Sequence, residues 1–413
     1  MLASYLLRPL IDQGQLTVVD ADGKRHVFSG RPGPSVAVRF HDKALHHRLL
    51  FNPKLAVGEA YMDGSLTVED GSLYDFIDLL ALNLAAYEAR PSRRLANGVQ
   101  RTLRAIHTHN PIQRARRNVA HHYDLSGALY DLFLDRDRQY SCAYFTPGTE
   151  TLEQAQENKK LHLASKLLLK PGQRLLDIGS GWGGLALYLA KLAGVDATGI
   201  TLSTEQHKVS NERAQKDGLA ERVRFHLRDY RAENGRYDRI VSVGMFEHVG
   251  VPHYETFFTQ VRDLLADDGV ALLHSIGRME PPSGTSPWLR KYIFPGGYTP
   301  ALSEVLSAIE RVGLWVTDIE VLRLHYAETL RHWRQRFEAN RARIADIYDE
   351  RFCRMWEFYL VGCEIAFRRL NQMVFQIQLA KRQDAVPLTR DYMFEFERAH
   401  REHAPAKAAA AAE

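Results

Sequence analysis

The sequence feature that most constrains the fold is the glycine-rich stretch from Arg174 to Tyr188, which reads RLLDIGSGWGGLALY. A short apolar run ends at Asp177 and Ile178, four glycines follow within six residues, and a helical pattern of leucines comes next. Strand, tight turn and helix in this order are typical of a nucleotide-binding unit, because glycine accepts positive φ and lets a ligand approach the backbone closely. The start of the helix would direct its free N–H groups at that ligand.

Two details of this stretch distinguish between cofactors. Asp177, at the end of the strand, can take a cationic or hydroxylated group. A nicotinamide dinucleotide would require an acid about twenty residues further on, at the tip of the second strand, to hold its ribose hydroxyls. That tip reads GITLS over residues 199–203, and the next acid is Glu205. The spacing favours S-adenosylmethionine over NAD, with an ordinary turn that binds nothing as the alternative.

The chain downstream of about residue 121 alternates between strand and helix patterns. This order predicts an α/β fold with a doubly wound, mostly parallel sheet whose ligands bind at the carboxyl ends of the strands. The expected strands are 174–178, 197–200, 223–227, 237–243, 270–276 and 315–321, with an antiparallel last strand over 374–379. Helical periodicity over 329–370 predicts an insertion that caps the ligand site.

The first 90 residues predict a small α+β domain. Asp22-Gly23 is a strong hairpin signal between two apolar runs, and residues 37–40 alternate as a strand. Helix patterns cover 53–61 and 73–87. This domain is either a folding or dimerisation module or a lipid-handling domain, and we expect a homodimer. The predicted organisation is an N-terminal domain (1–90), a basic linker helix (91–120), a core α/β domain (121–381) with its cap at about 327–371, and a loosely ordered tail (382–413).

The stretch from Arg90 to Arg117 is strongly basic. It contains eight arginines, and between Pro91 and Arg117 there is no acid. Apolar residues are interleaved so that they would share one helical face. Such a helix can bind an anionic membrane surface, or it can be a solvated linker.

Composition narrows the class of protein. The net charge of +4 over 413 residues is too small to indicate a nucleic-acid partner. Three cysteines indicate a reducing compartment without a disulfide framework. The sequence MLASYLLRPLIDQG lacks the features of a signal peptide, and no apolar stretch approaches the roughly eighteen residues that span a bilayer. We therefore expect a cytoplasmic protein, and the basic stretch adds the expectation that it associates peripherally with the inner face of the membrane.

Polar side chains collect after three of the predicted strands. Glu247 follows the fourth strand, His274 ends the fifth, and Tyr326 follows the sixth. An acid, an imidazole and a phenol at neighbouring strand ends could converge on one crevice. Each alone could instead be structural. Cys142 lies among polar and aromatic residues, which suggests a site, although a buried inert cysteine is the alternative. No spacing matches a familiar metal site.

At this point a family resemblance emerges. The segments HYDLSGALYDLFLD, QYSCAYF, LLDIGSGWGGLA, GITLSTEQ, GMFEHVG, LLHSIG, WLRKYIFPGGYTP and HYAETLRHW together resemble the cyclopropane-fatty-acyl-phospholipid synthases and the related mycolic acid methyltransferases. The resemblance covers about residues 40–381. It implies a methyltransferase that acts on the cis double bond of an unsaturated acyl chain in a membrane phospholipid.

The resemblance also implies site residues. Those matching S-adenosylmethionine contacts are Tyr140, Ser141, Gly179, Gly181, Thr201, Leu202 and Gln206, with Asp229 and Tyr230 flanking the adenine. Those matching positions that hold a bicarbonate ion are Cys142, Glu247, His274, Ile276 and Tyr326, where Cys142 and Ile276 would act through backbone groups. Cys363 matches an active-site thiol, but its apolar helical surroundings make a structural cysteine the simpler interpretation.

The implied chemistry explains the choice of residues. Methyl transfer to an alkene leaves a cation on the acyl chain, which the face of Tyr326 can stabilise, and a base must then remove a proton so that the ring closes. Bound bicarbonate can be that base, with Glu247 acting through a hydrogen bond to His274. An anion beside a carboxylate is repelled unless His274 is charged or Glu247 is protonated, so we predict a perturbed pKa at this pair. Alternatives are a methyl or methylene product from the same cation, a non-catalytic lipid-binding protein, or a small-amine N-methyltransferase.

Overall fold

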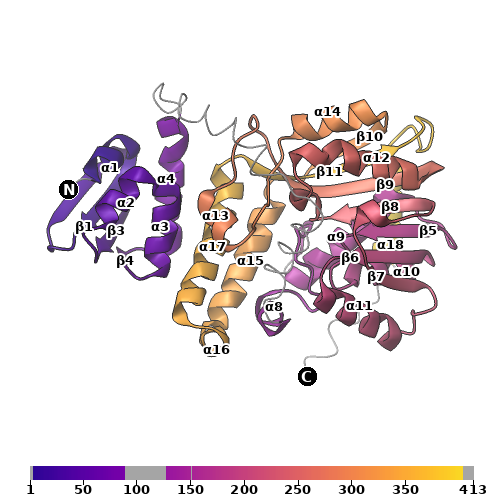
Figure 1. Ribbon diagram of the computed structural model, residues 1–413, viewed down its shortest axis with the longest axis horizontal. Coiled ribbons are helices and arrows are strands. Elements are labelled where there is room, and N and C mark those ends of the chain that lie inside the picture. The colour runs from indigo at the N-terminus through magenta and orange to yellow at the C-terminus, as the bar shows by residue number, and fades with distance from the viewer. Residues whose placement is uncertain (1–2, 89–126, 150, 403–413) are drawn as a thin grey trace.

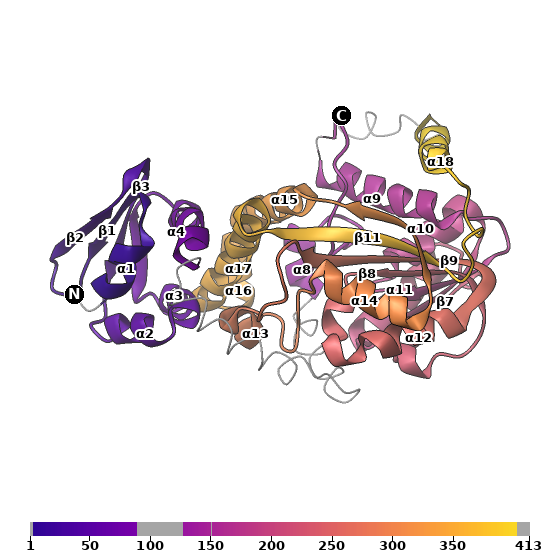
Figure 2. The same ribbon diagram turned by 90° about the horizontal axis from the view of Figure 1, so that it is seen from above.

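The computed structural model describes residues 3–88, 127–149 and 151–402, and these ranges contain two separate sheets (Figure 1). A four-stranded sheet of order β2-β1-β3-β4 belongs to the N-terminal unit. A seven-stranded sheet of order β10-β11-β9-β8-β5-β6-β7 belongs to the rest of the chain. Seen from above, a group of helices lies between the two sheets (Figure 2). None of the described helices is long and apolar enough to cross a membrane.

The N-terminal unit is built on the predicted hairpin. Strand β1 pairs antiparallel with β2 and parallel with β3, which pairs antiparallel with β4. The strands are β1 (Gln13–Val19), β2 (Arg25–Ser29), β3 (Arg31–Phe40) and β4 (Leu66–Asp70). The helices are α1 (Ser4–Leu10), α2 (Leu45–Phe51), α3 (Pro53–Met62) and α4 (Leu73–Glu88). The predicted helices at 53–61 and 73–87 are confirmed.

The large sheet confirms the predicted doubly wound α/β fold. Its strands are β5 (Arg174–Ile178), β6 (Asp196–Thr201), β7 (Val223–Leu227), β8 (Tyr237–Val243), β9 (Leu265–Arg278), β10 (Trp315–Val321) and β11 (Gln372–Ala380). Strands β5 to β9 are joined by parallel pairings. β11 runs antiparallel to both of its neighbours, β9 and β10, as predicted for the last strand.

Helices cover both faces of this sheet. On one face α9 (Leu152–Leu167) and α10 (Gly184–Ala193) share an apolar core with β5, β6 and β7, to which α11 (Thr204–Lys216) contributes Ala214. On the other face α12 (Tyr254–Leu264) and α14 (Leu302–Val312) pack on β8, β9 and β11. The two-sided burial explains why the strands read as nearly continuous apolar runs.

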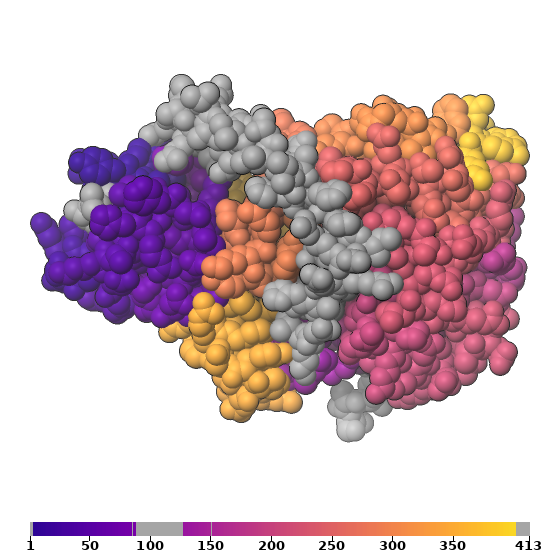
Figure 3. Space-filling view, viewed as in Figure 1, coloured from indigo at the N-terminus to yellow at the C-terminus, as the bar shows by residue number. Residues whose placement is uncertain are grey.

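The group of helices between the two sheets is the cap. It consists of α13 (Pro287–Tyr292), α15 (His325–Ala339), α16 (Arg341–Ile347) and α17 (Glu350–Arg369), and in the space-filling view it contacts the N-terminal unit directly (Figure 3). One face of α17 places Val361 and Ile365 in the core of the N-terminal unit. Its other face places Trp356, Tyr359 and Leu360 in the core beside the large sheet. The helix is therefore shared between two cores.

One prediction about the chain's end is wrong. The loosely ordered tail expected from residue 382 contains α18 (Asp391–Glu402), which packs against α9. Met393 and Glu397, one helical turn apart, are both buried. Glu397 Oε1 lies 2.6 Å from His162 Nδ1 of α9, so the helix is fixed by an internal polar contact. The basic stretch 90–117 lies outside the described residues, and its helix stays a prediction.

Candidate active site

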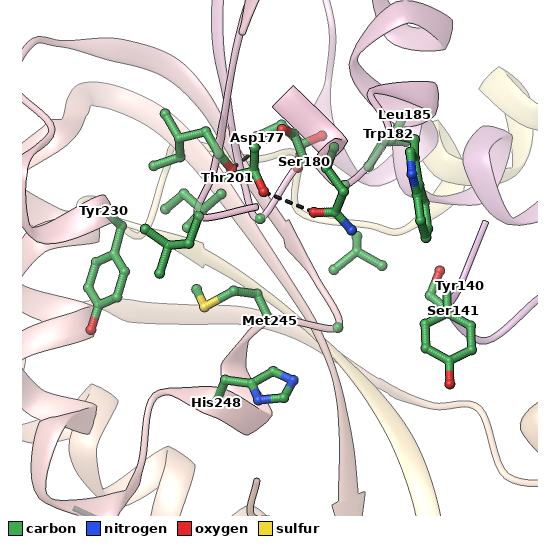
Figure 4. A pocket seen from close by; sticks show the side chains of 18 of the residues that line it. Tyr140, Ser141, Asp177, Ser180, Trp182, Leu185, Thr201, Tyr230, Met245 and His248 are labelled. Carbon is green, nitrogen blue, oxygen red and sulfur yellow. Dashed lines mark hydrogen bonds between the residues drawn. The ribbon is translucent and has the colours of Figure 1, made fainter. Parts of the chain in front are cut away.

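A pocket opens at the carboxyl ends of β5, β6 and β8 (Figure 4). A segment that follows α8 (Gly127–Phe133) forms one wall of it, and η1 (Tyr230–Ala232) and η2 (Phe246–His248) form another. All ten residues expected to hold the cofactor line this pocket. They are Tyr140, Ser141, Asp177, Gly179, Gly181, Thr201, Leu202, Gln206, Asp229 and Tyr230. The structure thus brings together residues that are up to ninety positions apart in the sequence.

The glycine turn forms the floor of the pocket. Gly179 and Gly183 have φ of +84° and +83°, a region that other residues rarely adopt. A Cβ on Gly179 would lie 2.7 Å from Cβ of Met245, and one on Gly183 would lie 2.6 Å from the ring of Phe225. Both positions therefore need glycine for backbone conformation and for space. α10 begins directly after the turn, at Gly184, with no side chain capping it.

Asp177 is the buried acid of the pocket. Its Oδ2 is inaccessible to solvent and has no hydrogen-bond partner among the described residues. Burial raises the pKa of Asp177 to about 7, against the opposing charge of Lys159. Lys159 is itself buried and donates to Ser141 Oγ at 3.0 Å and to Gln139. An unpartnered carboxyl oxygen on a residue that lines a pocket suits a ligand with a cationic or hydroxyl donor.

The second strand tip presents a hydrogen-bond donor. Thr201 Oγ1 donates to the amide oxygen of Gln206 at 2.9 Å, which orients that amide. The Nε2 of Gln206 makes no hydrogen bond to the described residues and is available to a ligand. Asp229 differs, because Arg231 holds both of its carboxylate oxygens at 2.8 and 2.7 Å. Asp229 therefore shapes its side of the pocket with a carboxylate that is already paired.

The six residues expected at the catalytic end do not line this pocket. Cys142 and Tyr326 belong to an aromatic core beneath the cap, against which Ile276 and Cys363 pack. Tyr140 connects the two regions. Its ring lines the pocket and stacks on Trp333 of α15 at 5.1 Å between centroids, and its hydroxyl lies 2.7 Å from that of Tyr359 on α17. The cofactor pocket and the aromatic core therefore share a wall.

Glu247 and His274 both have strongly perturbed pKa values, as predicted for this pair. Glu247 Oε1 accepts a hydrogen bond from the backbone N–H of Ile276 at 2.6 Å, while Oε2 is inaccessible and unpartnered within the described chain. Burial raises the pKa of Glu247 to about 7 and lowers that of His274 well below its usual value. Of the two expected states, the structure favours protonated Glu247 and neutral His274.

One expected contact is wrong. Glu247 does not bond to His274, because its Oε1 accepts the hydrogen bond of the Ile276 N–H instead. The expected contact of the Ile276 backbone with a bicarbonate ion stays a prediction. His274 instead pairs through Nδ1 with Gln376 Nε2 of β11 at 3.2 Å. The two groups are neighbours at the strand ends, each with a partner of its own.

Neither cysteine is an activated thiol. Burial raises the pKa of Cys363 to about 12, and that of Cys142 rises for the same reason. Cys363 lies on α17 and packs against the aromatic core, in the apolar helical surroundings that its sequence neighbours indicate. Since the thiolate is the nucleophile, neither side chain is suited to attack at neutral pH.

Sequence reasoning missed several residues of the site. Trp182, Arg138 and His248 line the cofactor pocket, and Gln376 contacts His274. The sequence does contain a signal for the role of Gln376. The last strand reads VFQIQL over residues 374–379, and two glutamines in a strand that is buried on both faces need buried partners.

Two family models match the chain. A model described as mycolic acid cyclopropane synthetase matches residues 110–377, and a model described as a domain of unknown function matches residues 6–87. The first match covers more than half of the chain and includes every residue of the site described above.

Known relatives and a solved structure agree with that model. The chain is 38% identical over 348 residues to the cyclopropane-fatty-acyl-phospholipid synthase of Escherichia coli, which covers 83% of this chain and 87% of that protein. It is 36% identical over 382 residues to a probable fatty acid methyltransferase of Pseudomonas putida, which covers 89% and 93%. The structure of mycolic acid cyclopropane synthase CmaA1, complexed with SAH and CTAB, is similar with a TM-score of 0.61 and 34% identity, covering 66% of this chain and 99% of that one.

Proposed function

This chain belongs to the mycolic acid cyclopropane synthetase family of S-adenosylmethionine-dependent methyltransferases, and on that premise we propose that it forms cyclopropane rings on the unsaturated acyl chains of membrane phospholipids. A methylene group from S-adenosylmethionine would be added across a cis double bond. The observation that supports this most directly is the shared wall at Tyr140, which sets a pocket suited to the cofactor beside a buried aromatic core.

The residues of the pocket fit S-adenosylmethionine. When bound, the cofactor supplies an electrophilic methyl group. Gly179 and Gly181 let it approach the backbone, Asp177 offers an unpartnered carboxyl oxygen, and Gln206 offers an amide N–H. Tyr140 and Ser141 close the side that borders the aromatic core. An isolated alkene is a weak nucleophile, so holding both reactants in place and excluding water lowers the barrier.

The aromatic core suits the acyl chain and the positive charge that develops on it. Tyr326 contacts Trp333 edge-on at 5.7 Å and Phe367 at 4.8 Å between centroids, and Tyr140 stacks on the same Trp333. Ring faces stabilise a cation without forming a bond to it, by about 0.5 to 2 kcal/mol each. Buried Cys142 and half-buried Cys363 add a soft apolar lining that does not attack.

Glu247, His274 and Tyr326 would hold a bicarbonate ion at the catalytic end, together with the backbone of Cys142. When bound, the ion supplies a base. The orphaned Oε2 of Glu247 supports this assignment, because a carboxyl that is protonated near neutral pH can donate to an anion rather than repel it. Ile276 contributes by orienting Glu247 through its N–H.

The setting of the enzyme in the cell is part of the proposal. A homodimer with separate N-terminal (1–90) and methyltransferase (121–381) domains would bind peripherally to the inner face of an anionic membrane through the basic linker. Replacing Arg93, Arg94, Arg101 and Arg104 with Gln should weaken co-sedimentation with anionic vesicles. Unchanged sedimentation would refute the membrane contact.

A second candidate product comes from the same cation. The relative in Pseudomonas putida is named a probable fatty acid methyltransferase and resembles this chain nearly as closely as the E. coli enzyme does. Loss of a different proton, or a hydride shift, would give a methyl- or methylene-branched chain without a ring.

The test is mass spectrometry of the fatty acids after the purified protein is incubated with S-adenosylmethionine, bicarbonate and vesicles of cis-monounsaturated phospholipid. A gain of one CH₂ per chain shows transfer, and proton NMR separates the cyclopropane from the methylene product. Gly179→Ala, which obstructs the pocket, is the control. No gain while the cofactor binds would refute the acyl substrate, and no binding of the cofactor would leave a non-catalytic lipid protein.

A further inference from the structure

Buried hydrogen bonds connect His274 to Gln376 and Gln376 to Lys166. His274 Nδ1 lies 3.2 Å from Gln376 Nε2, on the strand paired with β9. Lys166 Nζ, on α9, donates to Gln376 Oε1 at 2.7 Å and also contacts Glu320 of β10. His274, Gln376 and Lys166 are each no more than 2% exposed.

The donor and acceptor roles in this chain follow from chemistry alone. An ammonium group has hydrogens to donate and no lone pair to accept, so the atom of Gln376 that faces Lys166 is its oxygen. The other end of the amide, its NH₂ group, then faces His274 and donates. Nδ1 of His274 must accept that hydrogen bond. A neutral imidazole that accepts at Nδ1 has its proton on Nε2, and an imidazolium, which donates from both nitrogens, does not fit.

We propose that Gln376, oriented by Lys166, is a positioning residue that fixes His274 as the neutral tautomer with its proton on Nε2. The inference rests on the proposed function, in which His274 helps to hold the anion. It assigns His274 a definite role there. Nε2 is a hydrogen-bond donor to a bound anion and is not a proton acceptor, so His274 is not the base that completes the ring.

The charged groups around His274 act in the same direction. Lys159 and Lys166 of α9 and His162 of the same helix disfavour a positive imidazole, and Glu320 of β10 favours one. Glu320 is shared, however, because it contacts Lys166 and lies 2.6 Å from His162 Nε2. Its charge is therefore largely compensated. Glu247, the acid nearest along the sheet edge, is bonded to Ile276 instead.

β11 offers a matched control. Gln378 is as deeply buried as Gln376 and lies two residues further along the same strand. Its Nε2 donates to the backbone oxygen of Lys166 at 2.6 Å and to the Tyr392 hydroxyl at 2.8 Å. It opposes Leu272 rather than His274 in the strand pairing. Replacing Gln378 disturbs the same strand and the same lysine without touching the imidazole.

The decisive measurement is long-range ¹H–¹⁵N correlation NMR of the full-length protein labelled at histidine, without cofactor or bicarbonate, with His274→Asn used to assign the signal. We expect the Nε2–H pattern, unchanged between pH 6 and 8. Gln376→Glu puts a carboxylate against Nδ1 and should convert His274 to the Nδ1–H tautomer or to imidazolium. Lys166→Met, a second variant, releases the amide and should give a mixture of tautomers. Gln378→Met should keep the wild-type pattern.

The kinetic counterpart is a selective loss of turnover. Gln376→Glu should lower kcat on the order of 10- to 100-fold, as is typical when a supporting partner is lost, with KM for S-adenosylmethionine unchanged. Gln378→Met should stay within about two-fold of wild type. An Nδ1–H signal in the wild type would overturn the inference, as would a full tautomer change without loss of kcat. If the wild type shows the expected tautomer but makes no modified lipid, the proposed function fails and the assignment of the tautomer stands.

Discussion

The backbone N–H of Ile276 donates a 2.6 Å hydrogen bond to Oε1 of Glu247, and this contact joins the end of β9 to the turn that follows β8. Neutral donors around one oxygen do not compensate for burying a charged carboxylate whose Oε2 has no partner in the described chain. The acid therefore favours its protonated form, with its pKa raised to about 7 by burial. Folding here produces a neutral donor from a residue that is ordinarily an anion.

This protonation predicts a pH dependence of stability. Because the pKa of Glu247 rises from its ordinary 4.5 to about 7 on folding, its contribution is fully present below pH 4.5 and is lost as the pH rises through 7. Glu247→Gln keeps the bond from Ile276 but does not ionise. In urea unfolding, the free energy of unfolding of wild type should therefore fall, relative to that of the variant, by on the order of 3 kcal/mol between pH 4.5 and 8. Parallel curves would contradict the raised pKa. Asp177, unchanged in both proteins, cancels from the comparison.

Gly179→Ala should abolish cofactor binding. The new Cβ meets Cβ of Met245 at 2.7 Å, and the backbone there has φ +84°. The matched control is Gly172→Ala, since Gly172 also has positive φ (+78°) but nothing within 4 Å of a Cβ. Calorimetry with S-adenosylhomocysteine should show no binding for the first variant and wild-type affinity for the second. Both should lose about 1 kcal/mol or more of stability from backbone strain.

Cys363→Ala should leave the enzyme active. A thiol whose pKa is raised to about 12 is almost entirely protonated at pH 8 and does not act as a nucleophile. We expect kcat within about three-fold of wild type, because removal of one small, half-buried group affects packing more than chemistry. Iodoacetamide should modify Cys363 slowly, as followed by peptide mass spectrometry. Rapid alkylation of Cys363 in wild type, together with complete loss of turnover in Cys363→Ala, would indicate that Cys363 is a catalytic thiol after all.

Glu397→Ala should destabilise the fold although it lies beyond the last strand. Its carboxylate contacts His162 at 2.6 Å, and breaking one side of a buried pair typically costs about 3 to 5 kcal/mol. Glu395, on the same helix, is exposed and provides the control. Thermal unfolding of Glu397→Ala should show a Tm several degrees below that of wild type. The free energy of unfolding of Glu395→Ala should stay within about 0.5 kcal/mol of wild type. Equal effects would mean that α18 contributes little.

The parts of the fold that the sequence predicts well are those determined locally. Strands 174–178, 223–227, 237–243 and 315–321 are predicted at their observed bounds, because each is a short segment rich in β-branched, aromatic or other apolar residues, continuous or alternating with polar ones. The cofactor pocket was predictable for a related reason. In a parallel sheet, residues after the carboxyl ends of neighbouring strands meet at one edge, whatever their separation along the chain.

The contacts that the sequence did not predict depend on strand register and on partners that are distant in the sequence. The pairing of His274 with Gln376 requires knowing which residue of β11 opposes which residue of β9, across a separation of about one hundred residues. The bond from Ile276 to Glu247 depends on how far η2 extends beyond its strand. The sequence does not predict α18, because few of its residues are buried and because Glu397 gains its partner, His162 of α9, only in the folded chain.

The position of β11 in the sheet determines the order in which parts of the protein can fold during synthesis. A ribosome delivers β9, then α13 and β10, and then the cap helices α15, α16 and α17, before it delivers the strand that lies between β9 and β10. Until then β9 and β10 have no neighbour to join them, and exposed strand edges of this kind invite pairing with other chains. The cofactor pocket rests on β5, β6 and β8, all of which are complete by that time. A nascent chain would thus acquire the means to hold its cofactor before the partner of His274 exists, and becomes competent for chemistry only with its last strand.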